Sequence, residues 1–165
     1  MEILDLFNKD GTPLGKTIQR GNKDFLDGEF IKIVTVWIKC KNKYLIQKTS
    51  PSKHNEYAVS GGHIPTGSTP QKQALVELKE ELGVNLKESD LNYLGNIIIG
   101  HVIFESFIVI DDDFDKYKFN LQESEVSNID WFTIEELNNL VHETNFRKSS
   151  ALQYEKFIKN TGNQT

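Results

Sequence analysis

Runs of β-branched and aromatic residues recur along the chain, and short polar stretches separate them. Such runs are typical of strands that are at least half buried. The longest one, FIKIVTVWIK, spans residues 30–39 and predicts a central strand. The further strands are expected at residues 44–48, 57–59, 90–100, 101–110 and 126–132.

The helix with the clearest predicted boundaries covers residues 70–82. Thr69 is a typical N-cap residue, and Pro70 suits the first helical position. Gly83 can adopt the left-handed conformation that ends a helix. One stripe of this helix is apolar and should be buried; it consists of Ala74, Leu75, Leu78 and Leu82.

Two more helices are predicted near the end of the chain. Residues 133–143 begin with a capping box, in which the hydroxyl of Thr133 and the carboxylate of Glu136 cap each other's backbone. Residues 149–159 carry apolar side chains that are available for packing. Strands on either side of one helix, followed by two closing helices, predict an α/β fold with a mixed sheet between helices.

The chain has 165 residues, which is enough for one domain with a hydrophobic core. We expect a single domain over residues 1–165. Residues 1–29 should form an N-terminal hairpin extension, because two alternating segments flank a turn at Asn8-Lys9-Asp10-Gly11. Residues 160–165 are expected to be a frayed tail.

Composition restricts the class of protein. Hydrophobic residues make up 38% of the chain and charged residues 26%, which is ordinary for a globular domain. The net charge of −5 argues against a nucleic-acid partner, and no apolar run is long enough to span a membrane. A single cysteine, Cys40, and an acidic start without signal-peptide character together predict a cytoplasmic protein.

Three glutamates of the predicted helix, Glu77, Glu80 and Glu81, are spaced so that they share one face. Like charges at this spacing repel one another, and a divalent cation would relieve the repulsion. Mg²⁺ takes oxygen ligands, often one or two carboxylates together with substrate phosphates. The alternative is a solvated acidic face, which is common on surface helices. The preceding Gly61-Gly62, expected in a glycine loop, favours a site because glycine lets backbone approach a ligand closely.

The stretch from Gly62 to Val84 resembles the Nudix box, G-x5-E-x7-R-E-U-x-E-E-x-G-U, where U is a bulky aliphatic residue. Two positions depart from the box, since Ser68 replaces its first glutamate and Val76 replaces its arginine. The positions in register after the first glycine are Glu77, Leu78, Glu80, Glu81, Gly83 and Val84.

This resemblance implies a Nudix-type α/β/α sandwich and a hydrolase that cleaves a diphosphate bond in a small nucleotide-type substrate. It implies that Mg²⁺ or Mn²⁺ is held by Glu77, Glu80 and Glu81 with a backbone carbonyl near Gly61, and that Glu80 and Glu81 are catalytic. The arginine missing at Val76 normally helps to orient the glutamates, so slow turnover is expected.

The general base varies in position within the Nudix family, and three carboxylates are candidates. Glu105 sits in an apolar strand, where it is either exposed or part of a site, and it is the first candidate for the base or an extra ligand. Glu123 and Glu125, from the following loop, are the alternatives. The candidate substrate-binding residues are His63, Lys48 and Lys53, although simple exposure would also explain such side chains.

Two other functions stay open at this stage. The order around the box is also similar to isopentenyl-diphosphate isomerase, but that enzyme needs a cysteine and a histidine where this chain has Gly61 and Ile31. A non-catalytic nucleotide-binding module is supported by Ser68 and Val76. The sequence does not determine the oligomeric state, and a homodimer is possible.

Overall fold

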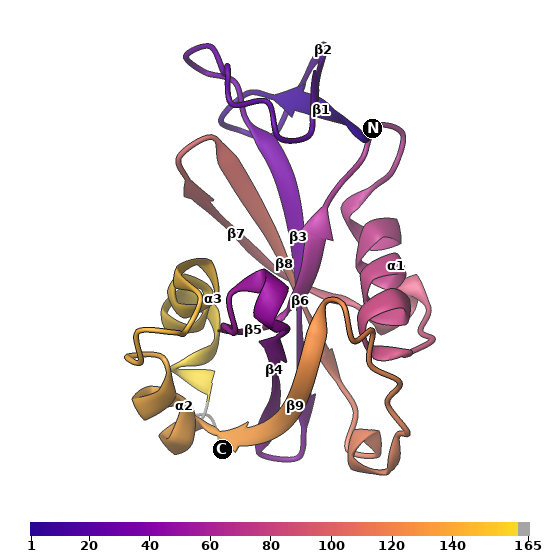
Figure 1. Ribbon diagram of the computed structural model, residues 1–165, viewed down its shortest axis with the longest axis vertical. Coiled ribbons are helices and arrows are strands. Elements are labelled where there is room, and N and C mark those ends of the chain that lie inside the picture. Colours follow the sequence, from indigo (N-terminus) through magenta and orange to yellow (C-terminus); the bar gives the residue numbers. More distant parts are fainter. Residues whose placement is uncertain (162–165) are drawn as a thin grey trace.

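The computed structural model describes residues 1–161, and its centre is a seven-stranded mixed sheet (Figure 1). The strand order is β5-β4-β3-β8-β7, with β6 also paired to β3 and β9 paired to β4. β3 and β8 run parallel, whereas the other pairs are antiparallel. The strands are β3 (Ile31–Cys40), β4 (Lys43–Thr49), β5 (Tyr57–Ala58), β6 (Ser60–His63), β7 (Asn92–Ile99), β8 (Val102–Ile110) and β9 (Val126–Thr133).

Helices cover both faces of this sheet, so the expected α/β/α sandwich is confirmed (Figure 1). On one face lies α1, Pro70–Leu82, whose N-cap and C-cap are Thr69 and Gly83 as the sequence predicts. On the other face lie α2, Ile134–Leu140, and α3, Lys148–Gln153. α3 runs into a π-helical turn, η4, over Tyr154–Ile158.

The two faces of β3 belong to two hydrophobic cores because successive side chains of a strand point in opposite directions. Val34, Val36 and Ile38 pack with Ala74, Leu78 and Leu82 of the apolar stripe of α1. Leu75, which was expected to be buried with them, is only partly buried, because it lies at the edge of the stripe. Trp37 packs in the second core, with residues of α2, α3 and η4. The sheet is therefore fixed from both sides, and α1 is held firmly against β3 and β6.

The N-terminal segment forms a two-stranded hairpin, β1 (Ile3–Phe7) and β2 (Pro13–Gln19), at one end of the sandwich (Figure 1). Backbone hydrogen bonds of 2.8 Å join Phe7 and Phe30 in both directions. A small third core holds the hairpin to the start of β3; it contains Leu4, Leu6, Ile18 and Ile31.

At the other end of the chain, the hydroxyl of Thr161 lies 2.9 Å from that of Tyr44, which joins the C-terminal segment to β4. Residues 162–165, the rest of the tail that we expected to be frayed, lie outside the described residues. Among the helices that the structure describes, none has the length and apolar character that crossing a membrane requires.

The expectation of a glycine loop before α1 is wrong, because Gly61 and Gly62 lie in strand β6 and pair with β3. The glycines are required by close packing: a Cβ atom at Gly61 would collide with the carbonyl oxygen of Val34. Glycine runs are weak strand formers, which is why the pattern predicts a loop. The strand places the Gly61-Gly62 backbone directly beside the glutamates of α1.

The segment that follows β8 is rich in charged residues, but it also contributes to the core. Its 3-10 turn η3, Phe114–Lys116, places the side chain of Phe114 in the core, where it is 2% exposed. Tyr117 and Phe119 pack against the same core. These aromatic residues therefore extend the core at the C-terminal end of α1, where the Tyr117 hydroxyl donates a hydrogen bond to the carbonyl of Gly83.

Candidate active site

Glu81 is the most deeply placed of the three helix glutamates, with 7% of its surface exposed. Its carboxylate accepts hydrogen bonds from the hydroxyl of Ser60 at 2.7 Å and from the backbone N–H of Gly61 at 3.1 Å. The side-chain amide of Gln47 on β4 donates a third, at 3.4 Å. Burial raises the pKa of Glu81, and these hydrogen bonds oppose the increase. α1 is thus tied to β6 through a carboxylate.

Glu77 lies one turn earlier, and its carboxylate sits directly over Gly62, where a Cβ atom would collide with it. The amide of Gln73 donates a hydrogen bond of 2.8 Å to the Glu77 carboxylate. Burial raises the pKa of Glu77 to about 7, and the charges of Glu81 and Glu80 act in the same direction. A carboxylate with this pKa is only partly ionised at neutral pH, so a nearby cation would stabilise its charged form.

Glu77, Glu80 and Glu81 all line one cavity of about 410 Å³, which we call the acidic cavity. Gly61, Gly62 and Glu125 also line it. Carboxylate and carbonyl oxygens are the donors that Mg²⁺ and Mn²⁺ prefer, so this set fits such a cation in kind. In residues 1–161, however, no three carboxylate, imidazole or thiol groups stand close enough together to form a metal site as they are.

Two of the three glutamates accept hydrogen bonds. Glu81 accepts hydrogen bonds from β6, and Glu77 accepts one from Gln73 on one of its carboxylate oxygens. Glu80 is exposed and lines the cavity. An ionised carboxylate has about four acceptor sites, so Glu77 can keep this hydrogen bond and still offer an oxygen to a cation.

A second cavity, of about 340 Å³, adjoins the first and is the candidate substrate pocket. Its wall combines apolar side chains with polar groups from β3, β4 and α3; they include Ile33, Phe104, Thr35, Gln47, Arg147 and Ser149. The residues that line both cavities are Arg20, Lys53, Gly61, Gly62, Glu81 and Glu125. The two cavities therefore meet over the glycine strand.

Of the three predicted substrate-binding residues, two line a cavity and one does not. His63 lines the substrate pocket, and burial lowers its pKa, followed by the charge of Arg20. Lys53 lines both cavities. Lys48 lines neither, since its ammonium group lies 5.3 Å from the centroid of the Tyr57 ring. His63 and Lys53 thus remain candidates, and Lys48 does not.

Glu105, the first candidate for the general base, does not reach either cavity. Glu105 as a residue is 8% exposed, and its carboxylate is paired with the ammonium group of Lys32 at 3.1 Å. It also accepts a hydrogen bond of 2.8 Å from the Tyr93 hydroxyl. These contacts describe a structural ion pair between β3, β7 and β8, and they leave Glu105 no access to a substrate in either cavity.

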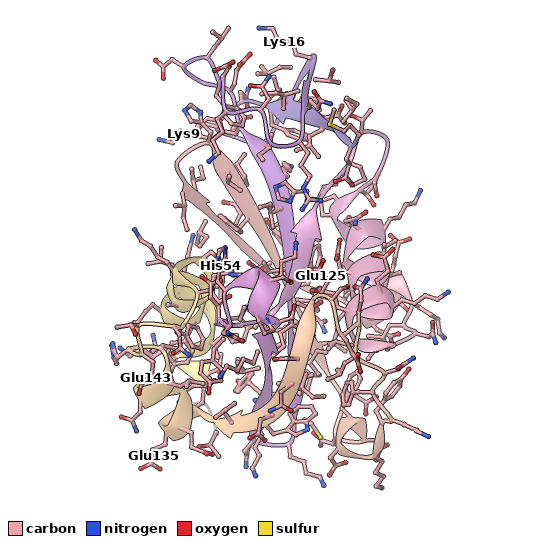
Figure 2. The ribbon with its side chains drawn as sticks, viewed as in Figure 1. Lys9, Lys16, His54, Glu125, Glu135 and Glu143 are labelled. Atoms are coloured by element: carbon pink, nitrogen blue, oxygen red, sulfur yellow. The ribbon has the colours of Figure 1, made fainter. Side chains whose placement is uncertain are left out.

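Of the two alternatives for the base, Glu123 is exposed and lines neither cavity, whereas Glu125 lines both. Glu125 precedes β9 and lies centrally, between α1 and the short helix η1 (Pro51–Lys53), as Figure 2 shows. The ammonium group of Lys53 lies 3.6 Å from the Glu125 carboxylate. The structure therefore favours Glu125 as the base candidate.

Sequence reasoning did not select Gln47, Thr35 or Arg147 as site residues, and it named Arg20 only as a side chain that simple exposure would also explain. The alternation of β4 shows that Gln47 and Lys48 face opposite sides, but it does not show which side carries the pocket. Arg147 and Arg20 reach the site from segments far away in sequence, so only the tertiary structure reveals them.

The NUDIX domain family model matches residues 31–155 of the chain. This segment contains the whole sheet together with α1 and α2, and it excludes the β1–β2 hairpin. A comparison with curated proteins finds no match.

Several solved structures share the fold. DR0079 from Deinococcus radiodurans is 21% identical and superposes with a TM-score of 0.73, covering 94% of this chain and 99% of its own. A MutT NUDIX hydrolase from Burkholderia pseudomallei is 14% identical with a TM-score of 0.62, covering 76% of this chain and 96% of its own. A bifunctional NMN adenylyltransferase/ADP ribose pyrophosphatase from Francisella tularensis was solved in complex with AMP and a manganese ion. It is 14% identical with a TM-score of 0.59, and the match covers 76% of this chain and 41% of that chain.

Proposed function

Because the chain belongs to the Nudix family, we propose that it is a divalent-metal-dependent hydrolase that cleaves the diphosphate bond of a nucleoside diphosphate derivative. The observation that supports this proposal best is the junction of the two cavities. The acidic cavity carries Glu77, Glu80 and Glu81, and it shares the Gly61-Gly62 backbone with a pocket large enough for a small ligand. A diphosphate at the junction would lie between metal-binding carboxylates and the substrate pocket.

Mg²⁺ or Mn²⁺ would be held by Glu77, Glu80 and Glu81 with a backbone carbonyl of the glycine strand. When bound, the cation neutralises charge on the diphosphate and makes a water molecule more acidic. Glu125 then accepts the proton of the attacking water, because it lines both cavities and is partly exposed. Lys53 and His63 would contact the substrate from the other side of the junction.

We propose that turnover is slow because the box lacks its arginine. Val76 lines the acidic cavity and is 41% exposed, and it has no hydrogen-bond donor to offer the glutamates. Hydrogen bonds to charged partners contribute roughly 1.5–3 kcal/mol, so a missing one of this kind slows chemistry by about ten- to a hundred-fold if it acts in the transition state.

A non-catalytic nucleotide-binding module is the second candidate. It is favoured by Val76, which stands where the box has an arginine, and by the absence of a cluster of three metal-binding side chains among the described residues. Against it, burial of two carboxylates on a helix face costs stability unless a cation or proton compensates. The pKa of about 7 for Glu77 expresses this cost.

The isomerase reading has less support. The position that would need a cysteine is Gly61, and a Cβ atom there would collide with the carbonyl oxygen of Val34. The position that would need a metal-binding histidine is Ile31, whose side chain is buried in the core with Leu4 and Leu6. The local structure therefore accommodates neither group of the isomerase. No label exchange is expected when the protein is incubated with isopentenyl diphosphate and Mg²⁺ in deuterated water.

The test of the hydrolase proposal is a screen of nucleoside diphosphate derivatives with Mg²⁺ and Mn²⁺, followed by release of phosphate or monophosphate. Titration with Mn²⁺ supplements the screen. Glu77→Gln and Glu81→Gln should each lose Mn²⁺ affinity, whereas Glu88→Gln, an exposed control in another segment, should not. If both cavity variants bind Mn²⁺ like the wild type, the metal site lies elsewhere.

A further inference from the structure

Arg20 directly follows β2, outside the segment that the family model matches, yet it lines both the acidic cavity and the substrate pocket. Two contacts with Glu2 hold it there. The backbone N–H of Arg20 donates to the carbonyl of Glu2 at 2.9 Å, and the guanidinium lies 2.9 Å from the Glu2 carboxylate. The N-terminal hairpin therefore delivers one cation to the junction of the cavities.

The charges at the junction indicate what the guanidinium of Arg20 could do there. Glutamates dominate the acidic cavity, and an anionic substrate entering it would be repelled unless cations face it. Of the residues that line both cavities, Arg20 and Lys53 are positively charged, and each is paired with one carboxylate, Arg20 with Glu2 and Lys53 with Glu125. Arg20 lines the walls of both cavities, so its charge acts on both sides of the junction.

The chemistry of the side chain identifies the ligand class. A guanidinium presents a planar fork of N–H donors that matches two oxygens of a phosphate group, and it is always charged. Its partner Glu2, which also lines the acidic cavity, holds it in place, and the side chain of Arg20 remains half exposed, with 51% of its surface accessible. The pairing with Glu2 therefore does not bury the guanidinium, which lines both cavities.

We propose that Arg20 is a substrate-binding residue that contacts phosphate oxygens at the junction of the two cavities, and that Glu2 is the residue that positions it. This inference rests on the proposed function for the identity of the substrate. It adds that the N-terminal hairpin, residues 3–19, is part of the active site. Val76 offers no positive charge to the acidic cavity, and Arg20, which also lines this cavity, supplies one from the segment that follows β2.

The test is calorimetric titration of the full chain with imidodiphosphate, a diphosphate analogue that resists hydrolysis, in the presence of Mg²⁺. Arg20→Gln should weaken imidodiphosphate binding by about ten-fold or more, the loss expected for a hydrogen bond between charged partners. Arg20→Lys keeps the charge but not the fork, and its loss should be smaller. Lys16→Gln is the matched control: it removes a cation at the outer end of the same hairpin, well away from Glu125 in Figure 2.

Two further measurements separate binding from a structural role. Arg20→Gln should leave Mn²⁺ affinity equal to or higher than that of the wild type, because it removes a positive charge beside the glutamates; a damaged fold would lower it. The effect of Glu2→Gln on imidodiphosphate binding should be less favourable in the wild-type background than in the Arg20→Gln background. Glu2 also lines the acidic cavity, so its direct repulsion of the anion is common to both backgrounds and cancels in the comparison.

The inference is overturned if Arg20→Gln binds imidodiphosphate as the wild type does, or if the wild type does not bind it. Either result is independent of the hydrolase proposal, which is judged by product release. If no substrate is hydrolysed but Arg20→Gln still loses imidodiphosphate binding, the hydrolase proposal fails and the role of Arg20 stands.

Discussion

The carboxylate of Glu77 occupies the space over Gly62 that the Cβ atom of any other residue would need. This relationship explains why the box begins with a glycine in this chain. The glycine is part of strand β6, and its missing side chain makes room for the carboxylate that faces the acidic cavity. The backbone of β6 and the Glu77 side chain of α1 therefore fit together at the position where we propose that a metal ion binds.

Gly62→Ala should displace the Glu77 carboxylate. We expect weaker Mn²⁺ binding together with a loss of about 1 kcal/mol or less in the free energy of unfolding, because the colliding atoms belong to the end of a flexible side chain that can move away. Denaturant unfolding and Mn²⁺ titration measure the two effects. In Gly62→Ala/Glu77→Ala the collision is absent, so the added stability cost of Gly62→Ala should largely disappear. Equal costs in both backgrounds would show that the contact does not matter.

Titration of Glu77 should make the stability of the metal-free protein depend on pH. Its pKa is about 7 in the folded state against an ordinary 4.5, so the folded protein binds more protons than the unfolded chain between these values. Its contribution to stability is present below pH 4.5 and is lost as the pH rises through 7. Urea unfolding in EDTA from pH 4.5 to 8 measures the loss.

The matched variant for this experiment is Glu77→Gln, which cannot titrate. Its stability relative to the wild type should rise across the same pH window. Glu81, with a raised pKa, contributes in the same direction as Glu77, and His63, with a lowered pKa, contributes in the opposite one. Subtraction of the two curves removes both. A difference that does not change with pH would contradict the environment described for Glu77.

Restoring the box arginine should accelerate the reaction. Val76 is partly exposed and faces the acidic cavity, so an arginine can extend there without displacing core side chains. Val76→Arg, alone or with Ser68→Glu, should raise kcat by about ten- to a hundred-fold on the substrate that the screen identifies. Thermal melting should be followed in parallel. A stable, metal-binding double variant that hydrolyses no nucleoside diphosphate derivative would favour the binding module.

The general base can be assigned by comparing two carboxylates. Glu125→Gln should lower kcat by about a hundred-fold or more, the usual contribution of general base catalysis. Glu105→Gln should leave kcat unchanged and lower stability instead, because it weakens the paired contact with Lys32. Steady-state kinetics and denaturant unfolding of both variants distinguish the roles. Loss of kcat in Glu105→Gln alone would restore Glu105 as the base candidate.

Much of the fold could be predicted because its elements carry local signals. The caps of α1, Thr69 and Gly83, are where the residue types require them, and the long strand at residues 30–39 is β3 within one residue. β6 was not predicted because the need for its two glycines arises from tertiary contacts. A Cβ atom at Gly61 or Gly62 would collide with Val34 or Glu77, and these contacts exist only in the folded chain.

The site could be predicted only where it lies on one element. Glu77, Glu80 and Glu81 share a helix face, so spacing alone groups them, and the structure places all three on one cavity. The choice between Glu105 and Glu125 depends on which face of which strand meets the cavity, and spacing does not encode this. Arg20 reaches the site through the hairpin, a relationship that no local pattern contains.

The central claim is that water attacks a diphosphate phosphorus in this site with the help of a divalent cation. The most direct test is to run the reaction in ¹⁸O-labelled water with Mg²⁺ and to analyse the phosphate-containing products by mass spectrometry. One labelled oxygen should enter the products for each bond cleaved, and labelling should stop in EDTA and in Glu81→Gln. Binding of nucleoside diphosphate derivatives without any labelled product, across the screened substrates and with both Mg²⁺ and Mn²⁺, would contradict the hydrolase account.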